Sequence, residues 1–318
     1  MVPYQEVRFK GTPEEVSEQW REARTHGVGG SDVAAILGLN KYRTALDVWI
    51  EKTGRAQGAD LSGVEAVEWG NRLEPAVASK FADVHPELRV RNKNAMMVSR
   101  SRPWAFANID RRLSMDGEPG VLEIKTVGYR RASDWEDGVP AYYLTQVLHY
   151  LSVTGWTYAY VAALIGGQKY VEYELKAEDY AEDIEYIDSV VDDFWQSYVL
   201  NDVEPAAAAD DGGGLAMLHP DGEGELLAPE AQEAVEKYEQ AKERERDLKD
   251  YKDAIAAEIK QLMGDHQTLD TGGFKVTWTR GERVSLDSRR LKAEAPEVYE
   301  RYARTSVRDG GLRVKAAD

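Results

Sequence analysis

The hydrophobic period of the chain changes several times between residues 66 and 175, and the order of these changes constrains the fold most. Apolar residues recur at helical spacing over residues 66–83, and the period then shortens to that of strands. A second apolar helix is expected at 141–153. The strands are expected at 88–99, 104–114, 121–127, 156–165 and 170–175. This order predicts an α/β fold in which helices flank a central mixed sheet.

Shorter helices are expected before this core, and a different composition follows it. The other predicted elements are helices at 20–24, 31–37, 45–53, 178–200, 229–263 and 288–304 and a strand at 273–279. Residues 201–228 are rich in Ala, Gly and Asp, which is typical of a linker. The helix at 229–263 carries a thin apolar seam that is weakly coiled-coil-like. We therefore expect a domain at 1–200, a linker at 201–228 and a C-terminal helical accessory region at 229–318.

The composition excludes several kinds of site. The chain has no cysteine, so disulfides, thiolate zinc sites, iron–sulfur clusters and cysteine nucleophiles are ruled out. The five histidines are scattered without metal-ligand spacing. The first residues, MVPYQEVRFKG, do not have the character of a signal peptide, and no stretch approaches the roughly 20 apolar residues of a membrane-spanning helix. We expect a soluble, cytoplasmic protein without a membrane partner.

The net charge of −17 is concentrated in one part of the chain. Residues 166–225 hold 2 Lys+Arg against 17 Asp+Glu, whereas residues 1–165 hold 20 against 21 and residues 226–318 hold 18 against 19. The acidity therefore does not exclude a local site for nucleic acid. The arginines near the predicted central strands are Arg100, Arg102, Arg111, Arg112, Arg130 and Arg131. They are interpreted either as a basic rim for a DNA backbone or as exposed loop charges.

Three charged residues on the predicted central strands, Asp110, Glu123 and Lys125, are candidates for a metal-binding or catalytic site. Side chains alternate along a strand, so Glu123 and Lys125 share one face and Leu122 and Ile124 share the other. A preceding strand that ends at Asp110 can place its carboxylate beside Glu123. Two carboxylates form an oxygen-rich site for Mg²⁺, and a neighbouring lysine can orient or deprotonate a water. Taken alone, the acid-x-Lys pattern is very common in proteins, and its ordinary interpretation is a solvated strand face with a Glu–Lys pair.

The wider pattern resembles the YqaJ-like viral recombinase family, to which lambda exonuclease is related, within the PD-(D/E)XK nuclease superfamily. The resemblance covers residues 18–200. Its opening block runs from Trp20-x₃-Arg24 through Gly29-Gly30-Ser31-Asp32-x-Ala34-Ala35-x-x-Gly38 and Lys41-Tyr42 to Trp49-x₂-Lys52-Thr53-Gly54. Gly70-x₃-Glu74, Asp110, Glu123-x-Lys125 and Gln146-x₃-Tyr150 follow in order. One departure from the superfamily pattern is Ile109, which stands where the superfamily name has proline.

The resemblance implies a restriction-endonuclease-like core and roles for individual residues. Asp110, Glu123 and the Ile124 carbonyl would bind Mg²⁺, with Mn²⁺ as an alternative and one or two ions per site. Glu74 would reach the same site directly or through water, and Lys125 would activate the attacking water. Gln146 would hold Lys125 or the water, and Tyr150 lies one helical turn further on. The alternatives are helix–sheet packing for Gln146 and Tyr150 and an exposed helix charge for Glu74.

Arg24 and Ser31 resemble the 5′-phosphate pocket of such exonucleases. A glycine-rich turn that opens a helix offers free backbone N–H groups and a positive dipole end, and Arg24 could add a bidentate phosphate contact. The alternative is that Gly29-Gly30-Ser31 only caps a helix and Arg24 is a surface charge. Trp104 and Trp135 could stack on unpaired bases, although core packing is the default for a tryptophan.

These residues predict a Mg²⁺-dependent exonuclease of phage recombination. The resemblance supplies the 5′→3′ polarity on linear double-stranded DNA, a ring-shaped homotrimer around that DNA, and a phage single-strand annealing protein as partner. If the gene is phage-borne, the compartment is the host cytoplasm. Two alternatives remain at this point: a structure-specific endonuclease or nickase with the same chemistry, and a non-catalytic scaffold that binds DNA ends.

Overall fold

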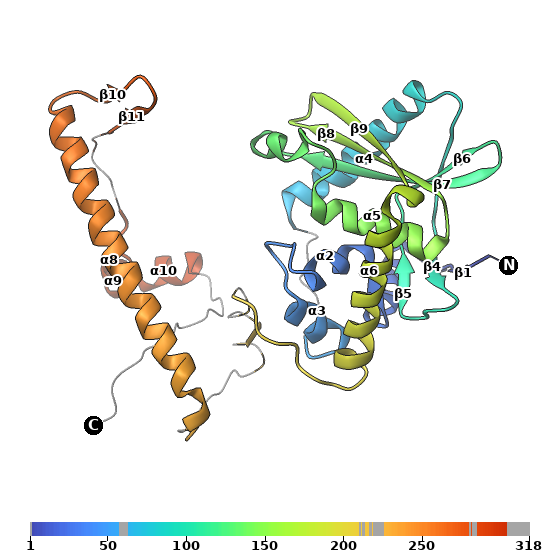
Figure 1. Cartoon of the computed structure of the whole chain (residues 1–318), viewed down its shortest axis with the longest axis horizontal. Coiled ribbons are helices and arrows are strands. Elements are labelled where there is room, and N and C mark those ends of the chain that lie inside the picture. The colour runs from blue at the N-terminus through green and yellow to red at the C-terminus, as the bar shows by residue number, and fades with distance from the viewer. Residues whose placement is uncertain are drawn as a thin grey trace. The chain divides into compact units, whose positions relative to one another are not determined.

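The chain divides into two compact units, residues 1–218 and residues 219–318. The computed structural model (Figure 1) describes residues 2–56, 63–209, 211, 214, 215, 218, 226–279, 281 and 285–303. The boundary between the units falls inside the segment 201–228, for which the sequence predicts a linker.

The first unit contains two sheets and the helices that pack on them. Its strands are β1 (Tyr4–Val7), β2 (Val28–Gly29), β3 (Arg89–Asn92), β4 (Met96–Ser99), β5 (Ala105–Ala107), β6 (Arg111–Met115), β7 (Glu118–Val127), β8 (Tyr158–Ile165) and β9 (Lys169–Lys176). Its helices are α1 (Pro13–Thr25), α2 (Gly30–Ile36), α3 (Ala45–Lys52), α4 (Glu65–Val84), α5 (Ala141–Thr154) and α6 (Ala181–Asp193), with shorter turns η1 (Tyr129–Trp135), η2 (Ala177–Tyr180) and η3 (Phe194–Val199).

The larger sheet is mixed and has the strand order β3-β6-β7-β8-β9. Only β7 and β8 pair in parallel, and the other three pairings are antiparallel. A parallel pair needs a crossover, and α5 supplies it between the two strands. The α/β architecture with a central mixed sheet, expected from the sequence, is confirmed.

Helices cover both faces of this sheet (Figure 1). On one face, Val77 and Phe81 of α4 pack with Leu122 and Ile124 of β7. On the other face, the buried side chains of α5 join the main core of the unit. The predicted helix at 66–83 is therefore present, although the first apolar residue of its stripe, Val67, is exposed.

Two of the predicted strands are each divided between the sheets. The smaller sheet has the order β1-β4-β5-β2, so the chain leaves the large sheet after β3, enters the small one at β4, and returns between β5 and β6. The expected continuous strands at 88–99 and 104–114 are therefore wrong in this respect. Residues 93–95 and 108–110 are the crossings, and Asp110 lies at the second one.

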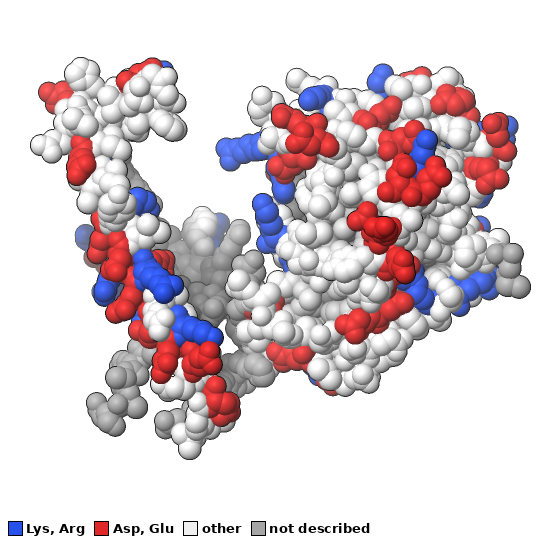
Figure 2. All heavy atoms as spheres, viewed as in Figure 1, with Lys and Arg blue, Asp and Glu red and all other residues white. Residues whose placement is uncertain are grey.

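Local capping explains where several helices start and end. Thr12 and Thr44 each form a capping box, with Glu15 and Asp47 respectively. Helix α5 ends at Gly155, whose φ of 66° is the left-handed conformation that glycine adopts without strain. The predicted acidic helix at 178–200 is present as η2, α6 and η3, and Figure 2 shows acidic side chains gathered along α6.

Part of the predicted linker packs on the first unit. Among the described residues of this segment, Leu215 and Leu218 contact the main core, and Asp211 is buried. Apolar contact with the core is the physical reason that this stretch differs from a free linker.

The second unit is built on one long helix. It contains η4 (Pro229–Ala231), α8 (Gln232–Met263), the hairpin β10 (Thr268–Asp270) and β11 (Lys275–Thr277), α9 (Ser288–Glu294) and α10 (Pro296–Tyr302). Pro296 begins α10, so the single helix expected at 288–304 is two helices; residues 304–318 lie outside the described part of the chain. The apolar seam of α8 is exposed at Leu248 and Tyr251. No helix within the described residues is both long enough and apolar enough to cross a bilayer.

Phe81 tests the packing of α4 against the sheet. Its side chain is fully buried among Leu113, Leu122 and Ala162. Phe81→Ala should lower the free energy of unfolding by about 3–5 kcal/mol, because it removes buried surface and leaves a cavity. Val84→Ala, on the same helix but exposed, should change it by less than about 0.5 kcal/mol. Urea denaturation measures both, and equal effects would contradict this packing.

Candidate active site

The central strand β7 places Glu123 and Lys125 on the face covered by α5. Its neighbours Leu122 and Ile124 point to the α4 face, as the alternation along a strand predicts. The antiparallel register pairs Arg111 with Leu122, so Asp110, one residue earlier, comes opposite Glu123. The Ile124 amide donates a hydrogen bond of 2.8 Å to Asp110 Oδ2. The two carboxylates are thus brought to the same end of the sheet.

Gln146 and Tyr150 of α5 complete a hydrogen-bonded network, which we call the catalytic cluster together with Asp110, Glu123 and Lys125. Lys125 Nζ lies 2.6 Å from Glu123 Oε1 and donates to Gln146 Oε1 at 3.1 Å. Gln146 Nε2 donates to Glu123 Oε1 at 2.7 Å and to the Tyr150 hydroxyl at 2.8 Å. The spacing of four residues puts Gln146 and Tyr150 on one face of the helix. Glu123, Lys125, Gln146 and Tyr150 are therefore in one hydrogen-bonded set, and Asp110 is attached to the same strand through the Ile124 amide.

The cluster has an oxygen that is free to bind a cation. Glu123 is buried, and no described residue offers its Oε2 atom a hydrogen bond. Within the described residues, no three acidic or histidine side chains converge as a ready-made metal cage. Two carboxylates with a backbone carbonyl nevertheless suit Mg²⁺, which keeps several of its waters and takes few protein ligands. The donor set of Asp110, Glu123 and the Ile124 carbonyl therefore fits a hard divalent ion.

Burial and mutual charge shift the protonation of the cluster. Burial raises the pKa of Asp110 to about 8, and the charge of Glu123 adds to the effect. Burial also raises the pKa of Glu123. Burial opposes the ammonium form of Lys125, but the carboxylates of Glu123 and Asp110 outweigh it and raise the lysine pKa. Lys125 is therefore a cation at neutral pH, and a metal ion bound at Asp110 would displace a proton.

Glu74 approaches the cluster without joining it. Its carboxylate forms an ion pair with Arg111, whose side chain lies on the α4 side of the sheet. The charge of Glu74 contributes to the raised pKa of both Asp110 and Glu123. The partnership with Arg111 was not predicted, because spacing alone does not reveal which arginine a helix carboxylate will meet.

Arg24 and Ser31 lie beside the cluster and contact each other. Arg24 Nη2 donates a hydrogen bond of 3.0 Å to Ser31 Oγ, and the Arg24 guanidinium lies 4.7 Å from the centroid of the Trp20 ring. A Cβ at Gly30 would come within 2.6 Å of the Tyr150 ring and 2.9 Å of Gln146. The glycine turn therefore packs directly on α5, and only glycine permits this approach.

A buried carboxylate that the sequence analysis did not single out organises this turn. Asp32 is fully buried and lies 2.9 Å from Lys52 Nζ and 3.8 Å from Arg24 Nη2, and it also pairs with Arg43. It accepts the Gly29 amide at 3.0 Å, so Gly29 is the helix cap and Ser31 lies inside α2. Although burial opposes its charged form, Lys52, Arg43 and Arg24 hold the pKa of Asp32 well below its usual range. Lys52 also donates to the Arg24 carbonyl at 2.7 Å.

Several arginines considered for a basic rim are engaged within the protein. Arg102 pairs with Asp188 of α6 at 2.7 Å, and Arg100 donates to the backbone carbonyl of Tyr4 at 3.0 Å. Trp135 is buried in the core. The Trp104 indole N–H donates to Asp192 at 2.8 Å, so this tryptophan is also tied to the fold. His149 is buried near the cluster and lies 3.2 Å from the Phe106 carbonyl, and burial lowers its pKa to about 4.

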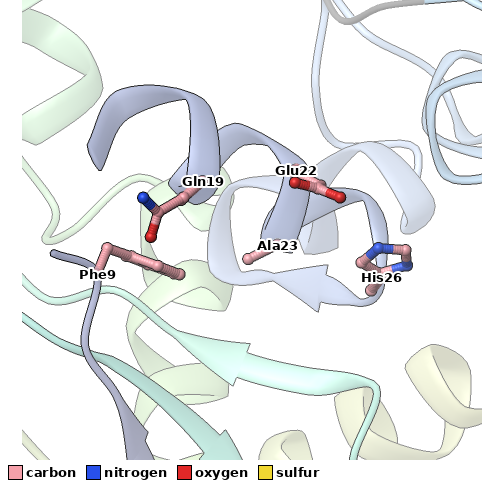
Figure 3. A pocket seen from close by; sticks show the side chains of 5 residues that line it. All are labelled: Phe9, Gln19, Glu22, Ala23 and His26. Atoms are coloured by element: carbon pink, nitrogen blue, oxygen red, sulfur yellow. The ribbon is translucent and has the colours of Figure 1, made fainter. Parts of the chain in front are cut away.

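Two surface pockets lie elsewhere. One, of about 280 Å³, is lined by Phe9, Gln19, Glu22, Ala23 and His26 beside α1 (Figure 3). Another, of about 510 Å³, includes Glu136, Asp137 and Glu174. Neither lining contains a lysine or arginine, so neither suits a phosphate backbone.

Sequence comparison identifies the family. A family model described as the YqaJ-like viral recombinase domain matches residues 19–157, which include the whole catalytic cluster and the Arg24–Ser31 pair. The chain is also 33% identical over 307 residues to the protein YqaJ of Bacillus subtilis (strain 168), with 93% of this chain and 94% of that protein covered. The chain belongs to the YqaJ-like viral recombinase family. Protein D345L of African swine fever virus is 36% identical over 66 residues, which are 21% of this chain and 19% of that protein.

The solved structures that resemble this chain share less sequence with it. An alkaline exonuclease (LHK-Exo) from Laribacter hongkongensis has a TM-score of 0.47 and 18% identity, with 59% of this chain and 94% of that chain covered. A phage-related exonuclease from Haemophilus somnus 129PT has a TM-score of 0.40 and 12% identity, with 55% and 96% covered.

The raised pKa of Asp110 predicts a pH-dependent stability. The folded pKa of about 8 exceeds the unfolded value of about 3.9, so the folded state retains a proton that the unfolded chain releases. This stabilisation is complete below the unfolded pKa and is lost as pH rises through the folded pKa. In EDTA, the free energy of unfolding of the wild type relative to Asp110→Asn should therefore fall between about pH 4 and about pH 8. Urea denaturation at each pH measures it, and parallel curves would contradict the shift.

Replacement of the buried Asp32 carboxylate is expected to lower the free energy of unfolding strongly. Asp32→Asn keeps the shape but removes the nearest counter-charge of the buried Lys52 ammonium, which then pairs only with Glu51 at 3.7 Å. Unfolding should therefore cost about 3–5 kcal/mol less. Asp202→Asn is the matched control, because Asp202 pairs with Arg55 on the surface and such a pair contributes at most about 1 kcal/mol. Urea denaturation compares the two, and a loss at Asp32 no larger than at Asp202 would refute this account.

Proposed function

We propose that this protein is a Mg²⁺-dependent deoxyribonuclease of viral recombination that degrades one strand of linear duplex DNA from its 5′ end and exposes a 3′ single strand. The observation that carries the proposal is the buried Glu123 carboxylate. One of its oxygens is held by Lys125 and Gln146, and the other has no partner among the described residues and lies in a cluster with Asp110. A stable core gains nothing from such an oxygen, because an unpaired buried polar atom destabilises the fold.

The residues divide the chemistry between them. Asp110, Glu123 and the Ile124 carbonyl would hold one or two Mg²⁺ ions, or Mn²⁺, and Glu74 would act through water. A bound ion would polarise the phosphoryl oxygen and lower the pKa of a bound water. Because Lys125 is protonated, it would orient the attacking water and offset developing negative charge on the phosphate rather than remove a proton.

Gln146 and Tyr150 would keep the lysine and carboxylate in place. Gln146 bonds to both Lys125 and Glu123 through opposite ends of its amide, and this fixes the distance between them. Burial raises the pKa of Tyr150 well above its usual range, so it remains a neutral phenol that anchors Gln146.

Arg24 and Ser31 support selection of a 5′ end. Around Asp32, three cations, Arg24, Arg43 and Lys52, form ion pairs with two carboxylates, Asp32 and Glu51. Asp47 adds a further electrostatic interaction with Arg43. Arg24 is the most distant of the three from the shared carboxylate, so its charge remains available for a phosphate. A terminal phosphate bound there would lie next to α5 and the catalytic cluster.

The family resemblance extends the proposal to assembly. A ring-shaped homotrimer that encloses DNA and a single-strand annealing protein that receives the 3′ strand are the expected partners. Sedimentation of the purified protein with and without duplex DNA tests the homotrimer.

The function is tested by digestion of duplexes labelled at either end, with and without a 5′ phosphate, in Mg²⁺. We expect loss of label from phosphorylated 5′ ends and no cutting of closed circular DNA. Cutting of closed circles would favour a nickase or structure-specific endonuclease. Binding of ends without any cleavage would favour a non-catalytic scaffold and refute the nuclease proposal.

Lys125→Ala should reduce the cleavage rate by about 10²- to 10⁴-fold while DNA binding is retained, because the residue acts on the reacting phosphate and water. Lys169→Ala, an exposed lysine on β9 of the same sheet, is the matched control and should cleave like the wild type. Arg24→Ala should reduce the preference for a 5′ phosphate over a 5′ hydroxyl. Gel-based time courses measure each rate, and normal cleavage by Lys125→Ala would sink the assignment.

A further inference from the structure

An aromatic surface begins at the catalytic lysine. Lys125 Nζ lies 4.7 Å from the centroid of the Tyr143 ring, and the Tyr143 and Tyr142 centroids are 4.1 Å apart with their planes at 46°. Buried Trp135 supports Tyr143 from behind, with a centroid distance of 5.6 Å. Tyr142 is half-buried and joins this group of rings through Tyr143.

The aromatic surface continues through Arg131 to Tyr42, whose side chain is largely exposed. The Arg131 guanidinium carbon lies 5.4 Å from the Tyr142 centroid, and Asp134 fixes the Arg131 Nε at 3.0 Å. Tyr42 is 85% exposed and lies near enough to Arg131 to contribute to the raised pKa of that guanidinium. The Tyr42 amide donates to Asn40 Oδ1 at 2.8 Å, so the loop that presents the ring is held locally. Arg130 is exposed beside Arg131.

The order of residues along α5 places this surface relative to the rest of the site. Tyr142, Gln146 and Tyr150 follow at intervals of one turn, about 6 Å each. The glycine turn with Ser31 packs at Tyr150 and Gln146, whereas Tyr142 lies at the opposite end. A strand with its 5′ phosphate at Arg24 and its scissile phosphate at Lys125 would therefore continue toward Tyr142.

We infer that Tyr42, Tyr142 and Arg131 form a stacking surface for unpaired bases on the 3′ side of the scissile phosphate. Aromatic rings and arginine planes bind bases of any sequence through their π-faces, and the adjoining positive charge suits the backbone. Trp104 and Trp135, the tryptophans considered from the sequence, are engaged in the core or with Asp192. This inference rests on the proposed nuclease function, since it is the position of Lys125 that identifies DNA as the occupant.

The test uses a 5′-phosphorylated duplex with a short unpaired 5′ segment that carries the fluorescent base 2-aminopurine on the 3′ side of the expected cleavage position. Measurements are made in EDTA, so that no divalent ion supports cleavage. Binding of wild-type protein should quench the fluorescence through stacking. The double variant Y42A/Y142A should lose the quenching and bind about 5- to 100-fold more weakly. Y42F/Y142F, which keeps both rings, should restore quenching and affinity.

Two further variants make the result independent of folding defects. Tyr42→Ala alone removes a ring that is almost fully exposed, and it should weaken both signals without changing stability. Tyr186→Ala, a tyrosine of α6 that is 62% exposed, is the matched control and should behave as the wild type. Unchanged quenching and affinity in Y42A/Y142A, or no recovery in Y42F/Y142F, would overturn the inference. Digestion of linear duplex by the wild type in Mg²⁺ is scored separately, and its absence would refute the nuclease function instead.

Discussion

The parallel pairing of β7 with β8 is the constraint on which the rest of the first unit depends. Two parallel strands cannot be joined by a tight turn, so the chain must cross the sheet, and α5 is that crossing. The crossover brings Gln146 and Tyr150 over the same face of β7 that carries Glu123 and Lys125. The opposite face is covered by α4. Once this pair forms, the positions of the network follow from strand alternation and helix period.

Charge is buried at two places in this unit, and the two differ in balance. Around Asp32, cations outnumber carboxylates, and the carboxylate itself is fully satisfied. At the catalytic cluster, carboxylates outnumber the single lysine, and one carboxylate oxygen has no partner among the described residues. The first arrangement can attract an anion and the second a cation. Because Gly30 packs directly on Tyr150 and Gln146, an anion bound at the first arrangement would lie near a cation bound at the second.

Local patterns predicted the part of the site that is set by local geometry. Alternation along β7 placed Glu123 with Lys125, and a spacing of four residues placed Gln146 with Tyr150. The division of the two early strands between sheets could not be predicted, because residues 88–99 and 104–114 have continuous strand character. Pairings between distant segments were missed for a similar reason. Asp32 meets Lys52, and Glu74 meets Arg111, only through tertiary packing. The exposure of each ring, which the sequence does not reveal, decides which aromatic residues can stack on a base. Tyr42 is exposed, whereas Trp135 is buried.

The residues proposed for chemistry and those proposed for end selection lie on separate stretches of chain. The catalytic cluster comes from residues 110–150, a segment whose strands and helix contact one another directly. Arg24, Ser31 and the ion pairs that hold them come from residues 24–52. The two stretches are separate in the sequence and meet where Gly30 packs on α5. Substitutions within α1–α3 could redirect such an enzyme to a different kind of DNA terminus while its hydrolytic machinery stays unchanged.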